Sequence, residues 1–301
     1  MTVSPDAVTK PEPGIKPAIL VISSTVVRGS VGGRGAAFAL ERFGHPVWLA
    51  QTVTLPWHPG HGRSSRIIPD EAAFEALIDD LIRAPWLGEI GAILTGYMGA
   101  ASQPAAVARL VDAVKAARPD ALYLCDPVMG DAGILYVPEA TASAIRDHLV
   151  PRADILTPNP TELGFLTGNL ALPAEALHAA ATSLPTRRIA VTSAAGTEGE
   201  ITTLLLSRNG DEASQQPSHD TIRASHAAIG GRVPNGTGDL FAALFLAHLV
   251  EGASDAEALR LATSAVADAI DAAAELGTNE LPLATIQDRL LAPRTPVRII
   301  P

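Results

Sequence analysis

Cysteine is nearly absent from this sequence, since Cys125 is the only one among 301 residues. A single cysteine excludes a disulfide framework of the kind that small secreted domains use, and it favours a cytoplasmic protein. Long apolar runs are absent as well: no stretch of about 18 residues is free of charges and turn residues, so we expect no membrane-spanning helix. The N-terminal segment also lacks the apolar centre of a signal peptide.

Lysine is scarce, with only three residues in the chain. Lys10 and Lys16 lie near the N-terminus, and Lys115 lies on the polar face of a predicted helix. A pyridoxal phosphate-dependent enzyme needs a buried lysine for its Schiff base, and a P-loop needs a lysine directly after its glycines. Neither class fits this chain. Any phosphate site must therefore rely on backbone amides, arginine or a metal ion.

Positive charge is in deficit, with 22 Lys and Arg against 32 Asp and Glu and a net charge of −10. Sequence-independent binding of nucleic acid requires a basic face, so we expect no nucleic-acid partner. The acidic residues are scattered, as on an ordinary solvated surface. Residues 1–17 are polar and proline-rich and predict a flexible tail, which leaves 18–301 as a single domain.

Short apolar runs recur along the chain, and each ends at a turn signal. They are residues 18–24, 46–52, 92–97, 122–127, 154–159 and 188–193. Alanine- and leucine-rich segments with helical spacing, such as 70–84 and 102–117, lie between most of them. This alternation predicts an α/β fold in which helices cover both faces of a central, mostly parallel sheet.

The second half of the chain adds to this pattern. Residues 200–208 predict a further strand that is partly antiparallel to the others. Three helical segments follow, at 239–251, 255–276 and 282–291. In an open sheet of this kind, ligands bind beyond the carboxyl ends of the strands.

Polar residues gather where the predicted strands end. They are Ser23, Ser24, Thr52, Tyr97, Asp126, Asn159, Thr192 and Ser193. Any one of them could be an ordinary turn residue, because Ser, Asn and Asp favour turns. As a set, together with the glycine loop at 236–238, they indicate a binding site.

The loop Gly236-Thr237-Gly238 runs directly into an apolar helix whose first turn carries Asp239. Glycines allow the unpaired amides of a helix N-terminus to approach an anion closely, which makes a phosphate site without lysine. A carboxylate would repel that anion. It fits if a substrate hydroxyl lies between the two, since the acid can accept the hydroxyl proton. The alternative is an acid that only complements the helix dipole.

Further acids follow two of the strands. Asn159 and Glu162, three apart at a helix start, fit either a Mg²⁺ site or a capping arrangement by Asn159 or Thr161. Asp126 ends a buried strand, and Asp131 follows it in a glycine loop; both could hold a metal or orient phosphate. Cys125 is expected to point the other way, into the core.

Two other motifs carry weaker signals. His58 and His61 in a proline- and glycine-rich loop could bind a metal, but loop contacts or a substrate lid are the favoured interpretations. The glycines of residues 29–35 do not fit the dinucleotide fingerprint in any register.

In this order, the pieces resemble the pyridoxal kinases of the ribokinase-like superfamily. The resemblance covers Ala18 to about Leu276 and rests on "ISSTVVRGSVGG", "ILTGYMG", "LYLCDPVMGD", "ILTPNPTEL" and "NGTGDLFAA". It implies the three-layer α/β/α ribokinase-like fold and ATP-dependent phosphorylation of the 5′-hydroxymethyl group of a vitamin B6 vitamer. It also implies Mg²⁺, in many members K⁺, and a homodimer.

The resemblance also implies roles for individual residues. Asp239 takes the role of catalytic base, and Gly236, Thr237 and Gly238 form the anion hole. The residues matched to ring contacts are Ser24, Thr52 and Tyr97. Those matched to the nucleotide are Asp126, Thr157, Asn159, Thr192 and Ser193. Glu162 and Asp126 match the residues near the metal, with contact through water.

The chain departs from the family pattern at two places. Gly33 stands where the family has asparagine, and "LPWHPGHG" (55–62) replaces a segment with phenylalanine and an asparagine–histidine pair. Both changes bear on recognition of the ring. Hydroxymethylpyrimidine kinase, which shares the fold and the glycine loop, and a non-catalytic B6-binding protein therefore stay open as alternatives.

Overall fold

The computed structural model describes residues 14–194, 198–209 and 218–301. Most of the predicted N-terminal tail, residues 1–13, lies outside this part of the chain. The remainder of the tail contacts the body of the protein. Lys16 Nζ donates to the carbonyl oxygen of Phe43 at 2.8 Å and to Glu251 Oε1 at 2.9 Å.

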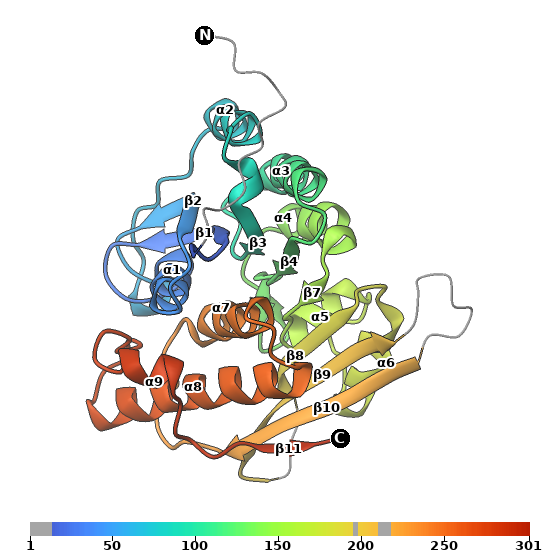
Figure 1. Cartoon of the computed structure of the whole chain (residues 1–301). Helices are drawn as coiled ribbons and strands as arrows, with labels where there is room; N and C mark the ends of the chain where they lie inside the picture. The colour runs from blue at the N-terminus through green and yellow to red at the C-terminus, as the bar shows by residue number, and fades with distance from the viewer. Residues whose placement is uncertain (1–13, 195–197, 210–217) are drawn as a thin grey trace.

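A nine-stranded sheet forms the centre of the described structure, in the order β11-β10-β9-β8-β7-β4-β3-β1-β2 (Figure 1). The strands are β1 (Ala18–Val26), β2 (Val47–Leu55), β3 (Ile90–Thr95), β4 (Leu122–Cys125), β7 (Ile155–Leu156), β8 (Arg188–Ala194), β9 (Glu200–Asn209), β10 (Ser218–Ala227) and β11 (Arg298–Ile300). Every pairing from β2 to β8 is parallel, and the three beyond β8 are antiparallel. The predicted mostly parallel sheet and the predicted antiparallel strand at 200–208 are both confirmed.

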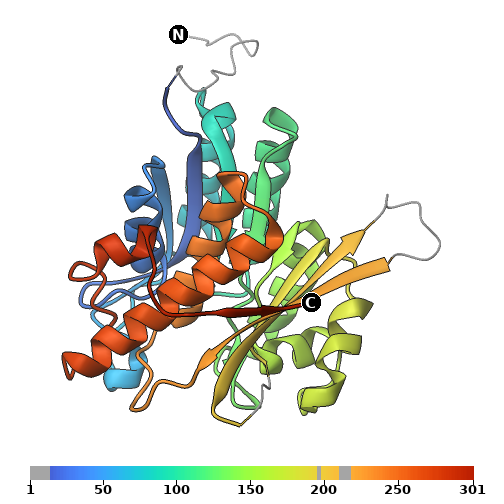
Figure 2. The same cartoon turned by 60° about the horizontal axis from the view of Figure 1, so that its bottom comes forward.

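Helices cover both faces of this sheet (Figures 1 and 2). One face carries α2 (Glu71–Ile82), α3 (Gln103–Ala117), α4 (Glu139–Ala144), α5 (Pro160–Leu166) and α6 (Leu177–Ser183). The other carries α1 (Gly33–Arg42), α7 (Thr237–Val250), α8 (Asp255–Glu275) and α9 (Gln287–Leu291). Neighbouring residues of β1 divide between the two cores: Leu20 and Ile22 face the first group of helices, whereas Ile19 and Val21 face the second. This division explains why the strands are continuous apolar runs rather than alternating ones.

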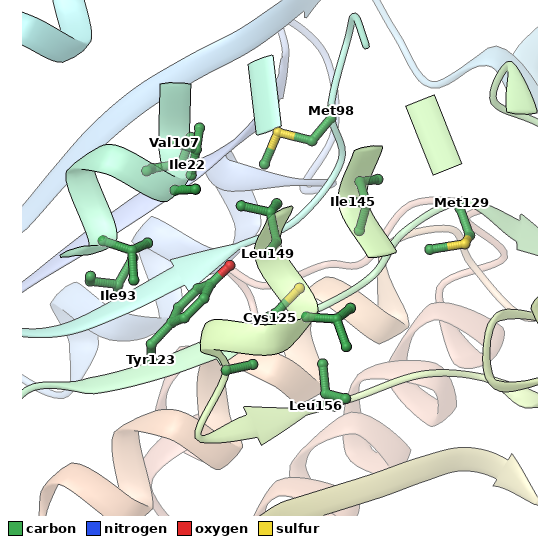
Figure 3. Packing of buried hydrophobic residues seen from close by; sticks show 14 of the residues in the cluster. Ile22, Ile93, Met98, Val107, Tyr123, Cys125, Met129, Ile145, Leu149 and Leu156 are labelled. Carbon is green, nitrogen blue, oxygen red and sulfur yellow. The ribbon is translucent and has the colours of Figure 1, made fainter. Parts of the chain in front are cut away.

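The predicted place of Cys125 is confirmed. Its side chain lies in the core beside Tyr123 and Leu156 (Figure 3), and burial raises the pKa of its thiol to about 12. The next residue in the chain, Asp126, therefore leaves the core side and reaches the edge where the parallel strands end.

Three expectations differ from the structure in detail. Strands β10 and β11 were not expected, because β10 is a mainly polar run and β11 has only three residues. The helix predicted at 282–291 begins only at Gln287, because the chain first makes a turn in which the carbonyl oxygen of Pro282 accepts from the amides of Thr285 and Ile286. A small hairpin, β5 (Gly130–Asp131) with β6 (Ile134–Leu135), occupies the predicted glycine loop.

None of the helices among the described residues is both long enough and apolar enough to cross a bilayer. The longest, α8, has 21 residues and carries charged side chains along one face. Helix α7 is apolar all round, but it has only 14 residues and is buried between the sheet and α8 (Figure 2). A helix of this kind is a buried core helix.

Candidate active site

The predicted acids meet at the edge where the parallel strands end. Asp126, which follows β4, and Asp239, in the first turn of α7, line the same small cavity. Ser23, Gly32 and Gly96 complete the polar side of that cavity. The chain therefore brings together residues separated by more than 200 positions in the sequence, at the sheet edge where an α/β fold binds its ligands.

The glycine loop has the conformation that its sequence predicts. Gly236 is the N-cap of α7 with a φ of 92°, in the left-handed region that favours glycine. A Cβ at this position would come within 3.0 Å of the carbonyl oxygen of Ser30. In the structure no side chain caps the helix, so the amides of its first turn stay free to bind a ligand.

Asp239 is held by the backbone of another loop. Its Oδ2 accepts a hydrogen bond of 2.9 Å from the amide of Gly32, which lies between β1 and α1. Burial raises the pKa of this carboxyl group to about 6, and the Gly32 amide opposes part of that rise. A carboxylate whose pKa lies near neutrality is suited to accept a proton and later release it.

Asp126 has few partners for a buried acid. Thr157 Oγ1 donates to its Oδ1 at 2.9 Å. Burial raises the pKa of Asp126 well above its ordinary value, and the nearby carboxylates of Glu162 and Asp239 raise it further. Within the described ranges, no three His, Cys, Asp or Glu side chains are grouped so that they could hold a metal ion by themselves.

Asn159 and Glu162 form the capping arrangement that the sequence offered as one interpretation. Asn159 Oδ1 accepts from the Glu162 amide at 3.0 Å, and Glu162 Oε2 accepts from the Asn159 amide at 2.8 Å. Glu162 Oε1 accepts from the amide of Met129 at 3.1 Å, so both carboxylate oxygens have backbone donors. Burial nevertheless raises the pKa of Glu162 to about 8. The carboxylate also fixes the start of the hairpin loop that follows Asp126.

The residues predicted to contact the ring lie on the other side of Asp239. Thr52 is fully buried within β2, and its hydroxyl donates to the carbonyl oxygen of Tyr97 at 2.7 Å. This bond orients Tyr97 and leaves the Thr52 oxygen only as an acceptor. Ser24 is buried against Gly32, where a Cβ would lie 2.4 Å from its Oγ. The loop that holds Asp239 is therefore packed directly on Ser24.

Ser23, one of the strand-end residues that together indicate a binding site, lines the cavity with Asp239. It is 3 % exposed, and its Oγ has no hydrogen-bond partner among the residues described. A Cβ on Gly96 would lie 2.6 Å from this oxygen and 3.8 Å from Asp239 Oδ1. The alternation of β1 did not reveal it, because Ser23 and Ser24 face opposite sides of the strand and both reach polar surroundings.

Thr192 and Ser193 lie next to the Asn159 loop. The amide of Thr192 donates to the carbonyl oxygen of Pro158 at 3.0 Å. Ser193 is exposed and has a φ of 51°, and the register of β8 with β9 shifts between Val191 and Ala194. A non-glycine residue in this conformation is uncommon and is found mostly where a turn or a binding site requires it.

The sequence analysis missed a second hollow at the same sheet edge. Its volume is about 780 Å³. The lining residues include Glu200, Ser225, Ala227, Gly230, Asp271 and Arg298. They come from β9, β10, α8 and the C-terminal segment. Since β10 and β11 gave no sequence signal, this hollow could not be found without the tertiary structure.

The histidines of the segment after β2 make loop contacts, as the favoured interpretation held. His58 Nδ1 accepts from the amide of Gly60 at 3.0 Å. Burial lowers the pKa of His58, and the neighbouring His61 lowers it further. His61 in turn contacts Glu280 and Asn279. The described residues around these two histidines do not form a metal site.

Comparison with known proteins gives a consistent result. The family described as "Phosphomethylpyrimidine kinase" matches residues 74–284. The pyridoxal kinase PdxY of Leifsonia xyli is 37% identical over 288 residues, covering 92% of this chain and 96% of the relative. The protein of the same name from Deinococcus radiodurans is 35% identical over 296 residues, covering 96% of this chain and 97% of its own.

Solved structures agree in fold and in sequence. The pyridoxal kinase from Leishmania donovani in complex with ADP and pyridoxamine has a TM-score of 0.85 and 29% identity to this chain, covering 95% of it and 100% of the solved chain. The complex of the same protein with ADP and pyridoxine also has a TM-score of 0.85 and 29% identity, with 94% and 99% covered. The structure of the pyridoxal kinase from Trypanosoma brucei, at 24% identity and a TM-score of 0.82, matches in fold.

The raised pKa of Asp239 predicts a pH-dependent change in stability. Because folding raises this pKa to about 6, the stability that the protonated group contributes is present at low pH and is lost as the pH rises through about 6. The amide of Asp239→Asn does not titrate, but it keeps an acceptor for Gly32. We expect the melting temperature of Asp239→Asn, relative to the native chain, to increase between about pH 4.5 and about pH 7.5. A constant difference across this range in thermal unfolding would contradict the prediction.

Proposed function

The chain belongs to the pyridoxal kinase family, and from this premise we propose that it transfers the γ-phosphoryl group of ATP to the 5′-hydroxymethyl group of pyridoxal. Pyridoxine and pyridoxamine carry the same hydroxymethyl group and are further candidate substrates. The relatives named pyridoxal kinase and the solved structures with ADP and B6 vitamers support this reaction. The product, pyridoxal 5′-phosphate, would place the enzyme in B6 salvage.

One observation carries the proposal: a carboxylate with a raised pKa stands beside the free amides of a helix N-terminus. Asp239 would accept the proton of the substrate hydroxyl as its oxygen attacks the γ-phosphorus. The new bond joins that oxygen to phosphorus, and the bond to the bridging oxygen of ADP breaks. The amides that follow Gly236 would stabilise the negative charge on the phosphoryl group during the transfer.

The nucleotide is assigned to the other half of the sheet edge. The predicted nucleotide residues Asp126, Thr157 and Asn159 follow β4 and β7, and Thr192 and Ser193 end β8. The hollow of about 780 Å³ lies further along the same edge, where β10 ends. We assign the phosphates to the first group of residues and the nucleoside to the region that leads toward this hollow. The vitamer ring then occupies the side of Ser24, Thr52 and Tyr97.

Mg²⁺ fits the acidic side of the phosphate region. Mg²⁺ binds through one or two carboxylates, water and substrate phosphates rather than through a cage of protein ligands. Asp126 would hold it with the phosphates, and Glu162 would act through water, because backbone amides occupy both of its oxygens. The bound ion would neutralise phosphate charge. Mutual repulsion among Asp126, Glu162 and Asp239 would be relieved by a cation placed there.

Phosphorylation of hydroxymethylpyrimidine is the second candidate function. The matching family is described as phosphomethylpyrimidine kinase, and hydroxymethylpyrimidine also carries a hydroxymethyl group on a heteroaromatic ring. The glycine loop and Asp239 cannot discriminate between the two substrates, because both present the same hydroxymethyl group. The distinction depends on the groups around the ring, including the segment with Trp57 and His58. A non-catalytic B6-binding protein is the remaining alternative, and the presence of Asp239 disfavours it.

Several further features stay predictions from the family resemblance. They are the use of K⁺, assembly as a homodimer and a cytoplasmic location. The cytoplasmic location agrees with the single, buried Cys125, since a disulfide framework is absent. The absence of nucleic-acid binding likewise stays a prediction from the net charge of −10.

Release of ADP over a panel of alcohols tests the proposed function directly. We expect kcat/KM for pyridoxal to exceed that for hydroxymethylpyrimidine by about 100-fold, because groups that bond the phenolic oxygen and aldehyde lose partners with the smaller ring. Both substrates are measured with the same MgATP and K⁺. Equal values, or a preference for the pyrimidine, would favour the second candidate function. Absence of ADP release with every alcohol would favour the binding protein.

Asp239→Asn should lower kcat by about 10²–10⁴-fold, the contribution typical of a general base. Its fold and its affinity for ATP should change little, since the amide keeps the bond from Gly32. For the native enzyme, kcat/KM should rise with pH up to about 6 and then level off, because Asp239 must be ionised to accept the proton. A variant that retains half of kcat would identify Asp239 as a residue that serves only the helix dipole.

Glu162→Gln separates the metal role from the capping role. Glutamine can preserve the reciprocal cap with Asn159, but it removes the charge. We expect the Mg²⁺ concentration for half-maximal rate to rise several-fold while KM for pyridoxal stays nearly constant. The measurement is a Mg²⁺ titration at saturating ATP. An unchanged midpoint would assign Glu162 to capping alone.

A further inference from the structure

Glu280 joins three segments that are far apart in the sequence. It lies after α8, and its Oε1 accepts from Arg28 Nη1, in the loop after β1, at 2.8 Å. The same oxygen lies 2.9 Å from Nε2 of His61, in the segment after β2. Figure 2 shows the end of α8 beside the light-blue segment that follows β2. The Glu280 and His61 side chains are only 12 % and 11 % exposed, so this contact is largely shielded from water.

Asn279 sets the state of the His61 ring. Its Nδ2, which can only donate, lies 3.2 Å from His61 Nδ1. The ring must therefore accept at Nδ1 and carry its proton on Nε2, the nitrogen that faces Glu280. Nε2 lies 2.9 Å from Glu280 Oε1 without the direction of a hydrogen bond, so the ring is placed against the carboxylate by close approach and by the bond from Asn279.

The loop after β1 has a glycine, Gly29, where a side chain would collide with Glu280. Gly29 has a φ of 104°, and a Cβ at this position would lie 2.4 Å from Glu280 Oε2. In the described part of the chain this buried oxygen has no hydrogen-bond partner. An unpaired buried oxygen costs stability, so stability alone does not account for a carboxylate at this place.

The segment held by Glu280 lies against the proposed catalytic loop. The carbonyl oxygens of Leu55 and Pro56 accept from the amides of Val27 and Arg28, each at 2.9 Å. Further along the segment, a Cβ on Gly60 would lie 3.1 Å from Nδ2 of Asn235, the residue before Gly236. Segment 56–62 therefore lies between the loop after β1 and the entrance to α7.

We propose that Glu280 is a positioning residue that holds segment 56–62 closed over the vitamer side of the site. The inference rests on the proposed function, because it assigns the ring to Ser24, Thr52 and Tyr97 next to this segment. Glu280 touches neither substrate. It acts through His61 and Arg28, and its loss should weaken binding of the vitamer while sparing the nucleotide at the other half of the sheet edge.

Glu280→Gln tests the proposal with Glu275→Gln as the matched control. Glu275 is exposed at the end of α8, so its substitution makes the same change from glutamate to glutamine away from His61 and Arg28. We expect Glu280→Gln to raise KM for pyridoxal by about tenfold, the loss typical of one charge-assisted hydrogen bond, and to leave KM for MgATP unchanged. Glu275→Gln should match the native enzyme. An unchanged KM for pyridoxal, or a parallel rise in both KM values, would overturn the proposal.

A double-mutant cycle with His61→Ala provides a second test. If Glu280 acts through His61, KM for pyridoxal in the double variant should not exceed KM in the more affected single variant. Additive effects on KM would overturn the coupling.

Hydrogen exchange needs no activity. We expect the amides of residues 60–62 to exchange faster in Glu280→Gln than in Glu275→Gln. Unchanged exchange would overturn the proposal that Glu280 holds segment 56–62. Faster exchange in a protein that phosphorylates no B6 vitamer would overturn only the proposed function.

Discussion

The hydrogen bond from the Gly32 amide to Asp239 is the contact on which the candidate site depends. It spans 2.9 Å and joins the loop after β1 to the first turn of α7, 207 residues further along the chain. Because Ser24 packs on Gly32 and Gly236 packs on Ser30, the same junction fixes the end of β1 and the glycine loop at 236–238 relative to each other. The burial that makes this junction rigid also raises the pKa of Asp239 to about 6.

Burial of Asp126 beside two other carboxyl groups is electrostatically unfavourable, and a bound cation would reduce this unfavourable energy. Burial and the carboxylates of Glu162 and Asp239 raise the pKa of Asp126, and Thr157 is the only side chain bonded to Asp126 among the described residues. Backbone amides bind both oxygens of Glu162, and burial raises its pKa to about 8. In the proposed reaction, a site of this kind would bind a metal–phosphate complex more readily than the phosphate alone, since the ion would supply the missing positive charge.

Contacts between distant segments also place segment 56–62, in which Trp57 is 37% exposed. Its place is set by polar contacts to Glu280 and Asn279, which follow the longest helix of the structure. Helix α8 therefore covers the sheet and also leads into the two residues that contact His61 of this segment.

The sequence by itself determined the central layers and the catalytic loop. Continuous apolar runs predicted the parallel strands, and Gly236 with Asp239 predicted an anion site and a base, because glycine conformation and helix termini are local properties. Only the tertiary structure showed the reciprocal cap of Asn159 and Glu162, brought Ser23 beside Asp239, and revealed the hollow beside β10. The last two depend on contacts between segments far apart in the chain, and local pattern carries no information about such contacts.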